Sequence, residues 1–374
     1  MTDVLLLGAG KIGRMIASLL ARTGDYRLRV GDASPAALAR LEQQVDVETM
    51  TVDADDPAAL AAALEGMTAV ISALSYRQNP AVARAALASG ASYFDLTEDV
   101  ATTRVVREVA RQANAGQVFV PQCGLAPGFI SIAANDLAGW FDEPHSIQMR
   151  VGALPEFPTH ALKYDLTWST DGLINEYCNP CEAILEGKRL EVLPLEGLEG
   201  FSLDGVNYEA FNTSGGLGTL CDKFEPAGLR ELTYKTIRYP GHRDLMKFLL
   251  EDLRLRERRD MLRQILEFAV PITFQDVVIV FCNVTGLRNG AHVKKSMALK
   301  LYPSVIEGEV WSAIQVTTAS AICALVDLWV HGKTPVTGFV RQEDICLGEF
   351  LANRFGQAYA AGDSTRTAVH PQLS

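Results

Sequence analysis

Short apolar runs alternate with longer amphipathic stretches over the first 121 residues of the chain. The runs are apolar at nearly every position, which is typical of strands that helices cover on both faces of a parallel sheet. The alternation predicts strands at 4–7, 27–30, 45–52, 69–72, 92–95 and 117–121, and helices at 12–23, 35–43, 56–64, 80–89 and 100–114. Strands joined by helices in this way predict a Rossmann-type, doubly wound α/β domain.

The pattern changes at residues 124–128, Gly-Leu-Ala-Pro-Gly, beyond which apolar and polar residues alternate along longer segments. Such alternation is typical of strands in a sheet with one buried and one open face. The clearest strands are expected at 147–152, at 163–168, and in a hairpin that joins 276–285 to 291–301. A second α+β domain, built on an open and mostly antiparallel sheet, is therefore predicted.

A long helix of small and apolar residues is expected to begin at residue 313 and to return to the first domain. Polar residues such as Gln315 and Asp327 interrupt its apolar surface, so it is predicted to pack on the first sheet and not to span a membrane. The expected domains are an NAD-binding Rossmann domain of residues 1–123 and 313–374, and a substrate and dimerisation domain of residues 124–312.

Composition places the chain among ordinary soluble globular proteins, because 48% of its residues are hydrophobic and 21% are charged. Its length of 374 residues is sufficient for two cores. The net charge of −11 argues against nucleic acid or an anionic membrane as the main partner, since both attract basic surfaces. Residues 1–3 lead directly into the first strand, without a basic or cleavable leader, so a cytoplasmic protein is expected.

Seven cysteines are spread over the chain, and this odd number fits a reducing compartment better than a disulfide framework. Cys178 and Cys181 form a CxxC pair, but no second pair completes a four-ligand zinc site. No metal is therefore expected.

A glycine motif follows the first strand and opens the first helix, with glycines at positions 8, 10 and 13. Gly8 permits a tight turn, Gly10 lets the backbone approach a pyrophosphate, and Gly13 lets the helix pack closely on its strand. The N–H groups at the start of the helix would then face the phosphates. The spacing and its context predict a dinucleotide site, against the alternative that the glycines only pack helix on strand.

Asp32 ends the second strand, 22 residues after Gly10, where a carboxylate can accept both hydroxyls of the adenosine ribose. The same carboxylate would repel a 2′-phosphate, so NAD is expected in preference to NADP. The carboxyl ends of the neighbouring strands complete the predicted site. The residues expected at the cofactor are Gly8, Ala9, Gly10, Lys11, Ile12, Gly13, Asp32, Asp53, Ala54, Ala73, Leu74 and Ser75.

Several segments of the chain resemble the saccharopine dehydrogenase-like family. They are 124–128 (Gly-Leu-Ala-Pro-Gly), Trp168-Ser169 and 235–242 (Lys-Thr-Ile-Arg-Tyr-Pro-Gly-His). The combination of 209–216 (Glu-Ala-Phe-Asn-Thr-Ser-Gly-Gly) with the last of these resembles the bacterial lysine 6-dehydrogenases in that family. The resemblance implies a homodimer of two-domain subunits that oxidises the ε-carbon of L-lysine with NAD. The products would be ammonia and 2-aminoadipate 6-semialdehyde, which cyclises to 1-piperideine-6-carboxylate.

Two other functions stay open: a saccharopine or carboxynorspermidine-type oxidoreductase acting on a secondary amine, and a non-catalytic NAD-binding sensor. The resemblance implies that saccharopine-forming relatives bind the glutamyl carboxylate with an arginine after the Trp-Ser segment. Asp171 stands at the matching place here, and we interpret it as selecting a cationic amine. The alternative is a helix N-cap, because residues 172–176 have a helical pattern.

Oxidation of an amine requires a proton acceptor, because hydride leaves carbon from a neutral amine and not from an ammonium group. Asp95, at the end of the fifth strand, is the first candidate, with an Asx cap as the alternative. His242 is the second candidate, although histidines near Pro-Gly turns are often structural. Ser75 and Tyr76 are placed to contact the nicotinamide ribose or the substrate, and Tyr76 has packing as its alternative role.

A substrate carboxylate requires a donor, and Arg238 offers a bidentate one beside Lys235. Thr213, Ser214 and Gly215 could add backbone N–H donors. The alternative for Arg238 is an ion pair between the domains.

Overall fold

The structure is a computed structural model that describes residues 1–306 and 308–360. Its first sheet is parallel throughout and has the strand order β3-β2-β1-β4-β5-β6-β17. The strands are β1 (Thr2–Leu7), β2 (Tyr26–Asp32), β3 (Glu48–Thr51), β4 (Ala69–Ser72), β5 (Ser92–Asp95), β6 (Val118–Val120) and β17 (Gly338–Phe339). The connecting helices are α1 (Lys11–Ala21), α2 (Pro35–Glu42), α3 (Pro57–Leu64), α4 (Asn79–Ser89) and α5 (Val100–Ala110). The order 3-2-1-4-5-6 confirms the predicted Rossmann-type sheet.

Strand β1 explains why the first runs are apolar at every position. Val4 and Leu6 share a core with α1, whereas Leu5 and Leu7 share a core with α3 and α4 on the opposite face. All four residues are at most 1% exposed. Helices therefore cover both faces of this sheet, as the sequence pattern requires.

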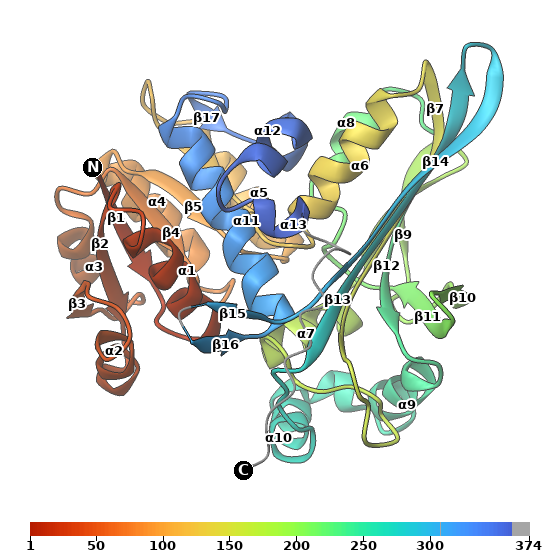
Figure 1. Cartoon of the computed structure of the whole chain (residues 1–374), viewed down its shortest axis with the longest axis horizontal. Coiled ribbons are helices and arrows are strands. Elements are labelled where there is room, and N and C mark those ends of the chain that lie inside the picture. Colours follow the sequence, from red (N-terminus) through yellow and green to blue (C-terminus); the bar gives the residue numbers. More distant parts are fainter. Residues whose placement is uncertain (307, 361–374) are drawn as a thin grey trace.

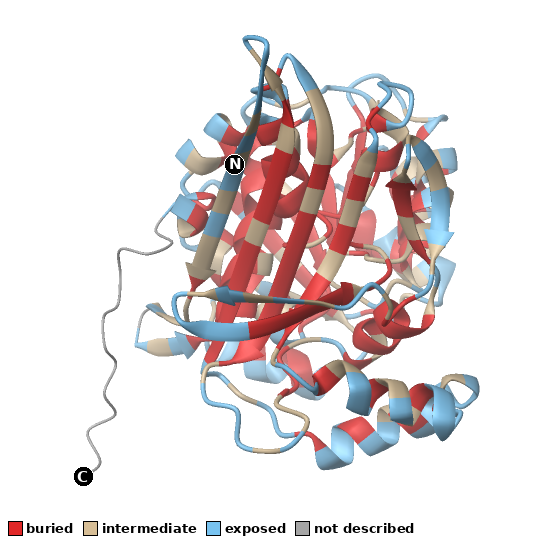
Figure 2. Ribbon diagram, turned by 90° about the vertical axis from the view of Figure 1, so that its right-hand side faces the viewer, coloured by how far each residue is buried: buried red, intermediate tan, exposed pale blue. Residues whose placement is uncertain are grey.

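The second sheet is open and mostly antiparallel, as predicted, and follows the path β10-β11-β12-β7-β13-β14, with β7 and β12 running parallel. Viewed face on, its central strands are buried over most of their length (Figure 2). Its strands are β7 (Glu143–Pro155), β8 (Cys181–Leu185), β9 (Lys188–Val192), β10 (Glu199–Leu203), β11 (Val206–Asn212), β12 (Glu231–Arg238), β13 (Asp276–Arg288) and β14 (Ala291–Leu301). The β13–β14 hairpin confirms the one expected from the sequence.

Five helices accompany this sheet, and a small separate hairpin precedes the C-terminal segment. The helices are α6 (Phe129–Gly139), α7 (Thr170–Cys178), α8 (Leu220–Phe224), α9 (His242–Lys247) and α10 (Arg259–Ala269). The hairpin consists of β15 (Ser304–Ile306) and β16 (Glu309–Trp311).

The strand expected at 163–168 is absent, and this prediction is wrong. Lys163 has a φ of 51°, and Leu166 makes only an isolated bridge to Ile272. Tyr164 and Leu166 belong instead to a third apolar core, which they share with α7 and α10. The alternation in this segment reflects a buried irregular connection and not a strand.

The C-terminal segment returns to the first sheet (Figure 1). Helix α11 (Ala313–Val330) packs on α1, and β17 pairs with β6. Helices α12 (Leu347–Ala352) and α13 (Gln357–Ala360) follow. By length and composition α11 could cross a membrane, but 83% of it is buried inside the molecule, as in the core helix of a globular protein. The domain limits stay a prediction, and residues 361–374 lie outside the described part of the chain.

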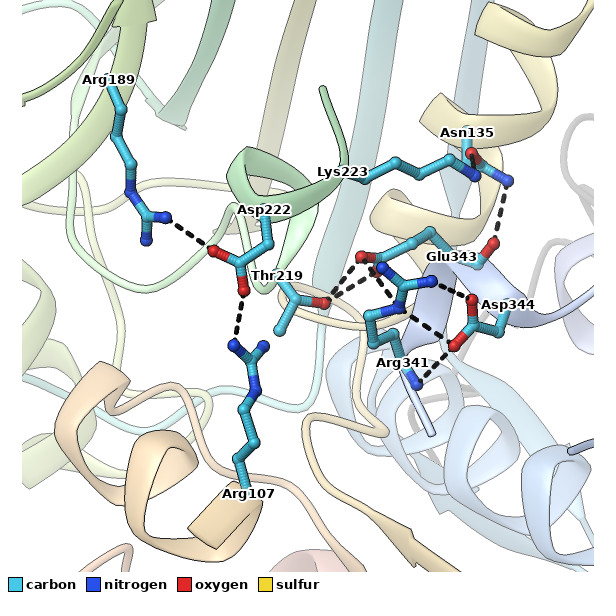
Figure 3. Close-up of polar contacts among 9 residues, drawn as sticks. All are labelled: Arg107, Asn135, Arg189, Thr219, Asp222, Lys223, Arg341, Glu343 and Asp344. Atoms are coloured by element: carbon cyan, nitrogen blue, oxygen red, sulfur yellow. Dashed lines mark hydrogen bonds and ion pairs between the residues drawn. The ribbon is translucent and has the colours of Figure 1, made fainter. Parts of the chain in front are cut away.

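Helix α8 links the two halves of the molecule through polar contacts (Figure 3). Asp222 forms ion pairs with Arg107 of α5 at 2.7 Å and with Arg189 of β9 at 2.6 Å. Thr219, just before α8, donates a hydrogen bond to the buried carboxylate of Glu343 in the C-terminal segment. These contacts hold the segment that precedes α8 against the first domain.

Candidate active site

The glycine motif has the geometry of a phosphate cradle. Gly8 has a φ of +102°, and a methyl group there would lie 2.9 Å from the carbonyl oxygen of Ala73. A methyl group at Gly13 would lie 1.8 Å from the carbonyl oxygen of Gly8, so the helix and the turn are in direct contact. A methyl group at Gly10 would meet nothing within 4 Å, which leaves open space above the N-terminus of α1. This is the arrangement that a dinucleotide pyrophosphate requires.

Asp32 lies beside this cradle. Its carboxylate accepts hydrogen bonds from the backbone N–H groups of Ala9 and Ser34, both at 2.7 Å. Two lone pairs therefore remain for other donors. Asp53, after β3, accepts the N–H of Asp55 at 2.9 Å in its own turn, so a cofactor contact from Asp53 or Ala54 stays a prediction.

A cavity of about 190 Å³ lies between the two sheets, next to the cradle. Loops at the carboxyl ends of β4 and β5 form one side, where a doubly wound sheet binds its ligands. Strands β7 and β12 and helices α7 and α11 form the other sides. The lining includes Ile12, Ala73, Leu74, Ser75, Tyr76, Leu96, Glu98, Gly124, Leu125, Ala126, Pro127, Gly152, Trp168, Ser169, Glu176, Tyr234, Thr236, Arg238, Ile314 and Thr318. The predicted Ile12, Ala73, Leu74, Ser75 and Tyr76 thus all face this cavity.

Arg238 is the basic residue of the lining and is only 2% exposed. Its Nε donates to the hydroxyl of Tyr177 at 2.9 Å and its Nη1 donates to the carbonyl of Ile237 at 2.8 Å. The guanidinium also lies over the ring of Tyr164, 4.8 Å from the centroid. Within the described residues no carboxylate comes within ion-pair distance of it, so the interdomain ion pair considered for this residue is not formed there.

Two glutamates, Glu98 and Glu176, are the acidic residues of the lining. Burial raises the pKa of Glu98 to about 7 and that of Glu176 to about 8. Arg238 opposes the shift of Glu176, and the neighbouring Glu98 adds to it. Oε1 of Glu98 is buried and has no hydrogen-bond partner among the described residues. Acidic groups with pKa values shifted toward neutrality in a cavity are typical of active sites.

Asp95 is not part of this lining, so the structure does not support its expected role as the base. Its fully buried carboxylate accepts hydrogen bonds from the Tyr93 hydroxyl at 2.7 Å and from the N–H groups of Thr97 and Gln122, each at 2.9 Å. The Thr97 contact is the Asx turn that was the alternative interpretation. Burial raises the pKa of Asp95 to about 6.

His242 also lies outside the lining, which corrects the second expectation for the base. Burial lowers the pKa of His242 to about 3, so its ring is neutral. Its Nδ1 lies 2.9 Å from the carbonyl of Leu162 and its Nε2 lies 3.1 Å from the Tyr177 hydroxyl. With Nδ1 protonated, Nε2 accepts from Tyr177, whose oxygen accepts from Arg238. His242 therefore positions Arg238 through Tyr177.

Strand β12 separates the two predicted basic residues. Tyr234, Thr236 and Arg238 alternate along it and line the cavity. Lys235 points to the opposite face, where its Nζ contacts Glu199 at 3.0 Å. The prediction that Lys235 lines the substrate site beside Arg238 is wrong because residues an odd number of positions apart on a strand, here three, point to opposite faces.

Residues 213–215, in the segment before α8, contact residues of the cavity lining. Thr213 and Thr236 are joined through their hydroxyls at 2.7 Å, and the N–H of Ser214 is bonded to the backbone carbonyl of Glu176 at 2.9 Å. These residues and Gly215 are not in the lining, so the expected nest of donors for a substrate carboxylate is not formed there.

Gly215 has a different role. It has a φ of +90°, and a methyl group there would lie 2.2 Å from the backbone oxygen of Glu98. Asn175 of α7 contacts the adjacent Asp99 at 3.4 Å. The second domain thus fixes the loop that carries Glu98.

Asp171 lies in the first turn of α7 but does not line the cavity. Its carboxylate is 3.9 Å from Arg263 of α10, and its side chain is 36% exposed. The helix cap is Ser169, which accepts the N–H of Gly172 at 3.2 Å. Ser169, and not Asp171, is therefore the helix cap, and the cavity lining does not support the expected role of Asp171 in selecting the amine.

Sequence reasoning missed both glutamates of the cavity. Glu98 follows β5 by three residues, at the edge where the sheet binds ligands, so its position was available as a signal. Glu176 lies two helical turns after Ser169 and therefore on the same face of α7.

Cys178 and Cys181 are both buried. Burial raises the pKa of Cys181 to about 12, which disfavours the thiolate that redox or metal chemistry requires. Within residues 1–306 and 308–360, no three His, Cys, Asp or Glu side chains gather as metal ligands.

Comparison with known families identifies the fold. Residues 4–120 match the saccharopine dehydrogenase NADP binding domain, and residues 124–355 match the saccharopine dehydrogenase C-terminal domain. The chain belongs to the saccharopine dehydrogenase family. Apo saccharopine dehydrogenase (L-Glu forming) from Saccharomyces cerevisiae superposes with a TM-score of 0.75 over 96% of both chains. At 16% sequence identity, that likeness establishes the fold alone.

The chain matches only part of the length of its curated relatives. Mitochondrial alpha-aminoadipic semialdehyde synthase of Rattus norvegicus is 24% identical over 315 residues, which are 78% of this chain and 32% of the relative. Saccharopine dehydrogenase [NADP(+), L-glutamate-forming] of Saccharomyces cerevisiae is 26% identical over 210 residues, 52% of this chain and 45% of the relative. The chain thus spans about a third of the length of the mammalian relatives.

Proposed function

We propose that this protein oxidises the ε-amine of L-lysine with NAD, releasing ammonia and 2-aminoadipate 6-semialdehyde. The carrying observation is the charge of the cavity lining, which has one arginine and two glutamates among the described residues. Ionised L-lysine has one carboxylate and two ammonium groups, which complement this set once both glutamates are ionised, and a bound ammonium group favours the ionised form of each. A buried site binds charge well only when each charge finds a partner.

When bound, the nicotinamide supplies the acceptor for hydride. The protein's own residues bind and orient the amino acid. Arg238 offers a buried, fixed guanidinium to the α-carboxylate, because Tyr177 and Tyr164 hold it in place. The lining is mostly apolar and includes Trp168, and apolar surroundings strengthen charge contacts such as these.

Saccharopine is the second candidate substrate, because the yeast relative is named for it. It has three carboxylates, and the described lining offers one basic residue to them. Burying an unpaired carboxylate costs several kcal/mol, so the charge count favours lysine.

The experiment that tests the proposal uses the purified protein with NAD and measures reduced nicotinamide by absorbance together with released ammonia. Reduction and ammonia release with L-lysine are expected. Reduction with saccharopine alone would favour the secondary-amine alternative. No reduction with either substrate and with either NAD or NADP would favour the sensor alternative.

The homodimer and the cytoplasmic location stay proposals.

Cofactor choice gives a separate prediction. Asp32 is expected to give at least a tenfold preference for NAD over NADP in kcat/KM, or about 1.4 kcal/mol, because its carboxylate repels a 2′-phosphate. Asp32→Ala should erode this preference while the KM for lysine stays unchanged. The family match carries the name NADP binding domain, so the measurement is decisive. Equal kcat/KM with both cofactors in the wild type would contradict the prediction.

A further inference from the structure

We propose that Glu98 takes the proton from the ε-ammonium group of the substrate, while Arg238 and Glu176 hold the α-carboxylate and the α-ammonium on the side of the cavity formed by β12 and α7. The assignment rests on the proposed function and deepens it.

Position separates the two glutamates. Glu98 is on the loop after β5, in the first domain, on the same sheet edge as residues 73–76 and the glycine cradle. Arg238 and Glu176 come from β12 and α7 of the second domain. The reacting carbon must lie at the cofactor, and a doubly wound sheet binds its cofactor at this edge. The end of lysine that reacts therefore faces Glu98, and its amino-acid end faces the second domain.

Glu98 also has the acceptor atom that a base requires. Its buried Oε1 has no hydrogen-bond partner among the described residues. Asp95, the nearest acidic residue on the strand before it, has its carboxylate bound by three donors. A buried polar atom without a partner is unfavourable in the folded protein unless a ligand supplies the donor.

The backbone of Glu98 is held in place by the second domain. Gly215 packs directly against its carbonyl group, and Asn175 contacts the neighbouring Asp99. The loop therefore places the carboxylate in a fixed position, as proton transfer demands.

The proton step balances as follows. One N–H bond of the ε-ammonium breaks and an O–H bond forms on Glu98, which leaves a neutral amine and a neutral carboxylic acid. The nitrogen lone pair exposed in this way forms the C=N bond as hydride leaves the ε-carbon for the oxidised nicotinamide. Water then adds to the carbon of the resulting iminium cation, both protons of the water pass to nitrogen, ammonium leaves, and the proton on Glu98 returns to solvent.

Glu98→Gln keeps the shape of the side chain and removes the base. Its kcat/KM for L-lysine near neutral pH should fall by about 10²–10⁴-fold. In the wild type, log kcat/KM should rise through the pKa of Glu98, about 7, and that of Glu176, about 8, to a plateau above both. In Glu98→Gln it should keep rising with pH toward the free-amine pKa of roughly 10.4, because the substrate must arrive already deprotonated. A merely structural role would lower the whole profile without changing its shape.

Two further measurements complete the test. Glu98→Asp keeps a carboxylate and should keep the wild-type shape of the profile, at reduced height. Calorimetry of lysine binding in buffers of different ionisation enthalpy should detect proton release from wild-type Glu98 near its pKa, and less release in Glu98→Gln. An active wild type with an unchanged profile in Glu98→Gln would overturn this assignment alone. A wild type inactive with lysine would overturn the proposed function and this assignment together.

Discussion

Arg238→Gln is expected to lower kcat/KM for L-lysine by roughly 100-fold or more, because truncating one partner of a buried, hydrogen-bonded charge pair costs roughly 2–5 kcal/mol. Arg238 is the basic residue among the described cavity residues, so no neighbour replaces it for the α-carboxylate. Initial rates with lysine and with 1,5-diaminopentane, which lacks the carboxylate, measure the effect. The loss should be confined to lysine.

The selectivity of this loss is what distinguishes binding from folding. Arg238 also donates to Tyr177 and to the carbonyl of Ile237, so its removal disturbs the local network. A disturbance of the network would slow both amines equally. Loss of a carboxylate partner slows lysine and leaves the diamine at or near its wild-type rate.

Lys235→Gln is the matched control. It removes a positive charge three residues before Arg238 on the same strand, but on the opposite face, where Lys235 pairs with Glu199. Its kinetics should equal those of the wild type with both amines. Equal losses of the two amines in Arg238→Gln, or a lysine-selective loss in Lys235→Gln, would contradict the assignment of Arg238.

The first sheet was predictable from sequence because its strands are buried on both faces, and this gives continuous apolar runs such as Val4–Leu7. The cradle was predictable for a related reason, since Gly8 and Gly13 are required by contacts between close neighbours in the chain. The irregular segment 163–168 was not, because its burial depends on α7 and α10, which approach it only in the folded protein.

The charged residues of the cavity show the same limit. Arg238 was found because it lies in a distinctive segment, but the sequence could not show whether the face of β12 that carries Lys235 or the face that carries Arg238 points inward. Asp171 and Glu176 lie on one helix, and only the packing of α7 against the cavity places the second of them in the lining. Asp95 ends its strand where a ligand would bind, yet the hydroxyl of Tyr93 and two backbone N–H groups occupy its carboxylate.

Glu176→Gln is expected to stabilise the ligand-free protein at alkaline pH and to weaken lysine binding. Burial raises the pKa of Glu176 from 4.5 to about 8. Since the folded-state pKa is raised, the native protein binds this proton more tightly than the unfolded chain does. The contribution of this proton binding to the free energy of unfolding is fully present below pH 4.5. It decreases as the pH rises and is lost above about pH 8. At roughly 1.4 kcal/mol per pKa unit, the shift corresponds to a few kcal/mol.

Glutamine removes this titration, so the difference in Tm between Glu176→Gln and the wild type should be small in acid and should grow to roughly a few °C in alkali. The kinetic counterpart is a raised KM for lysine with little change for 6-aminohexanoate, which lacks the α-amino group that Glu176 binds. Asp171→Asn is the control, because Asp171 lies on the same helix but outside the cavity lining. Scanning calorimetry over the pH range and initial rates with both substrates measure the two effects. A pH-independent difference in Tm would show that Glu176 is not a buried acid with a raised pKa. Equal losses with both substrates would show that it does not bind the α-ammonium group.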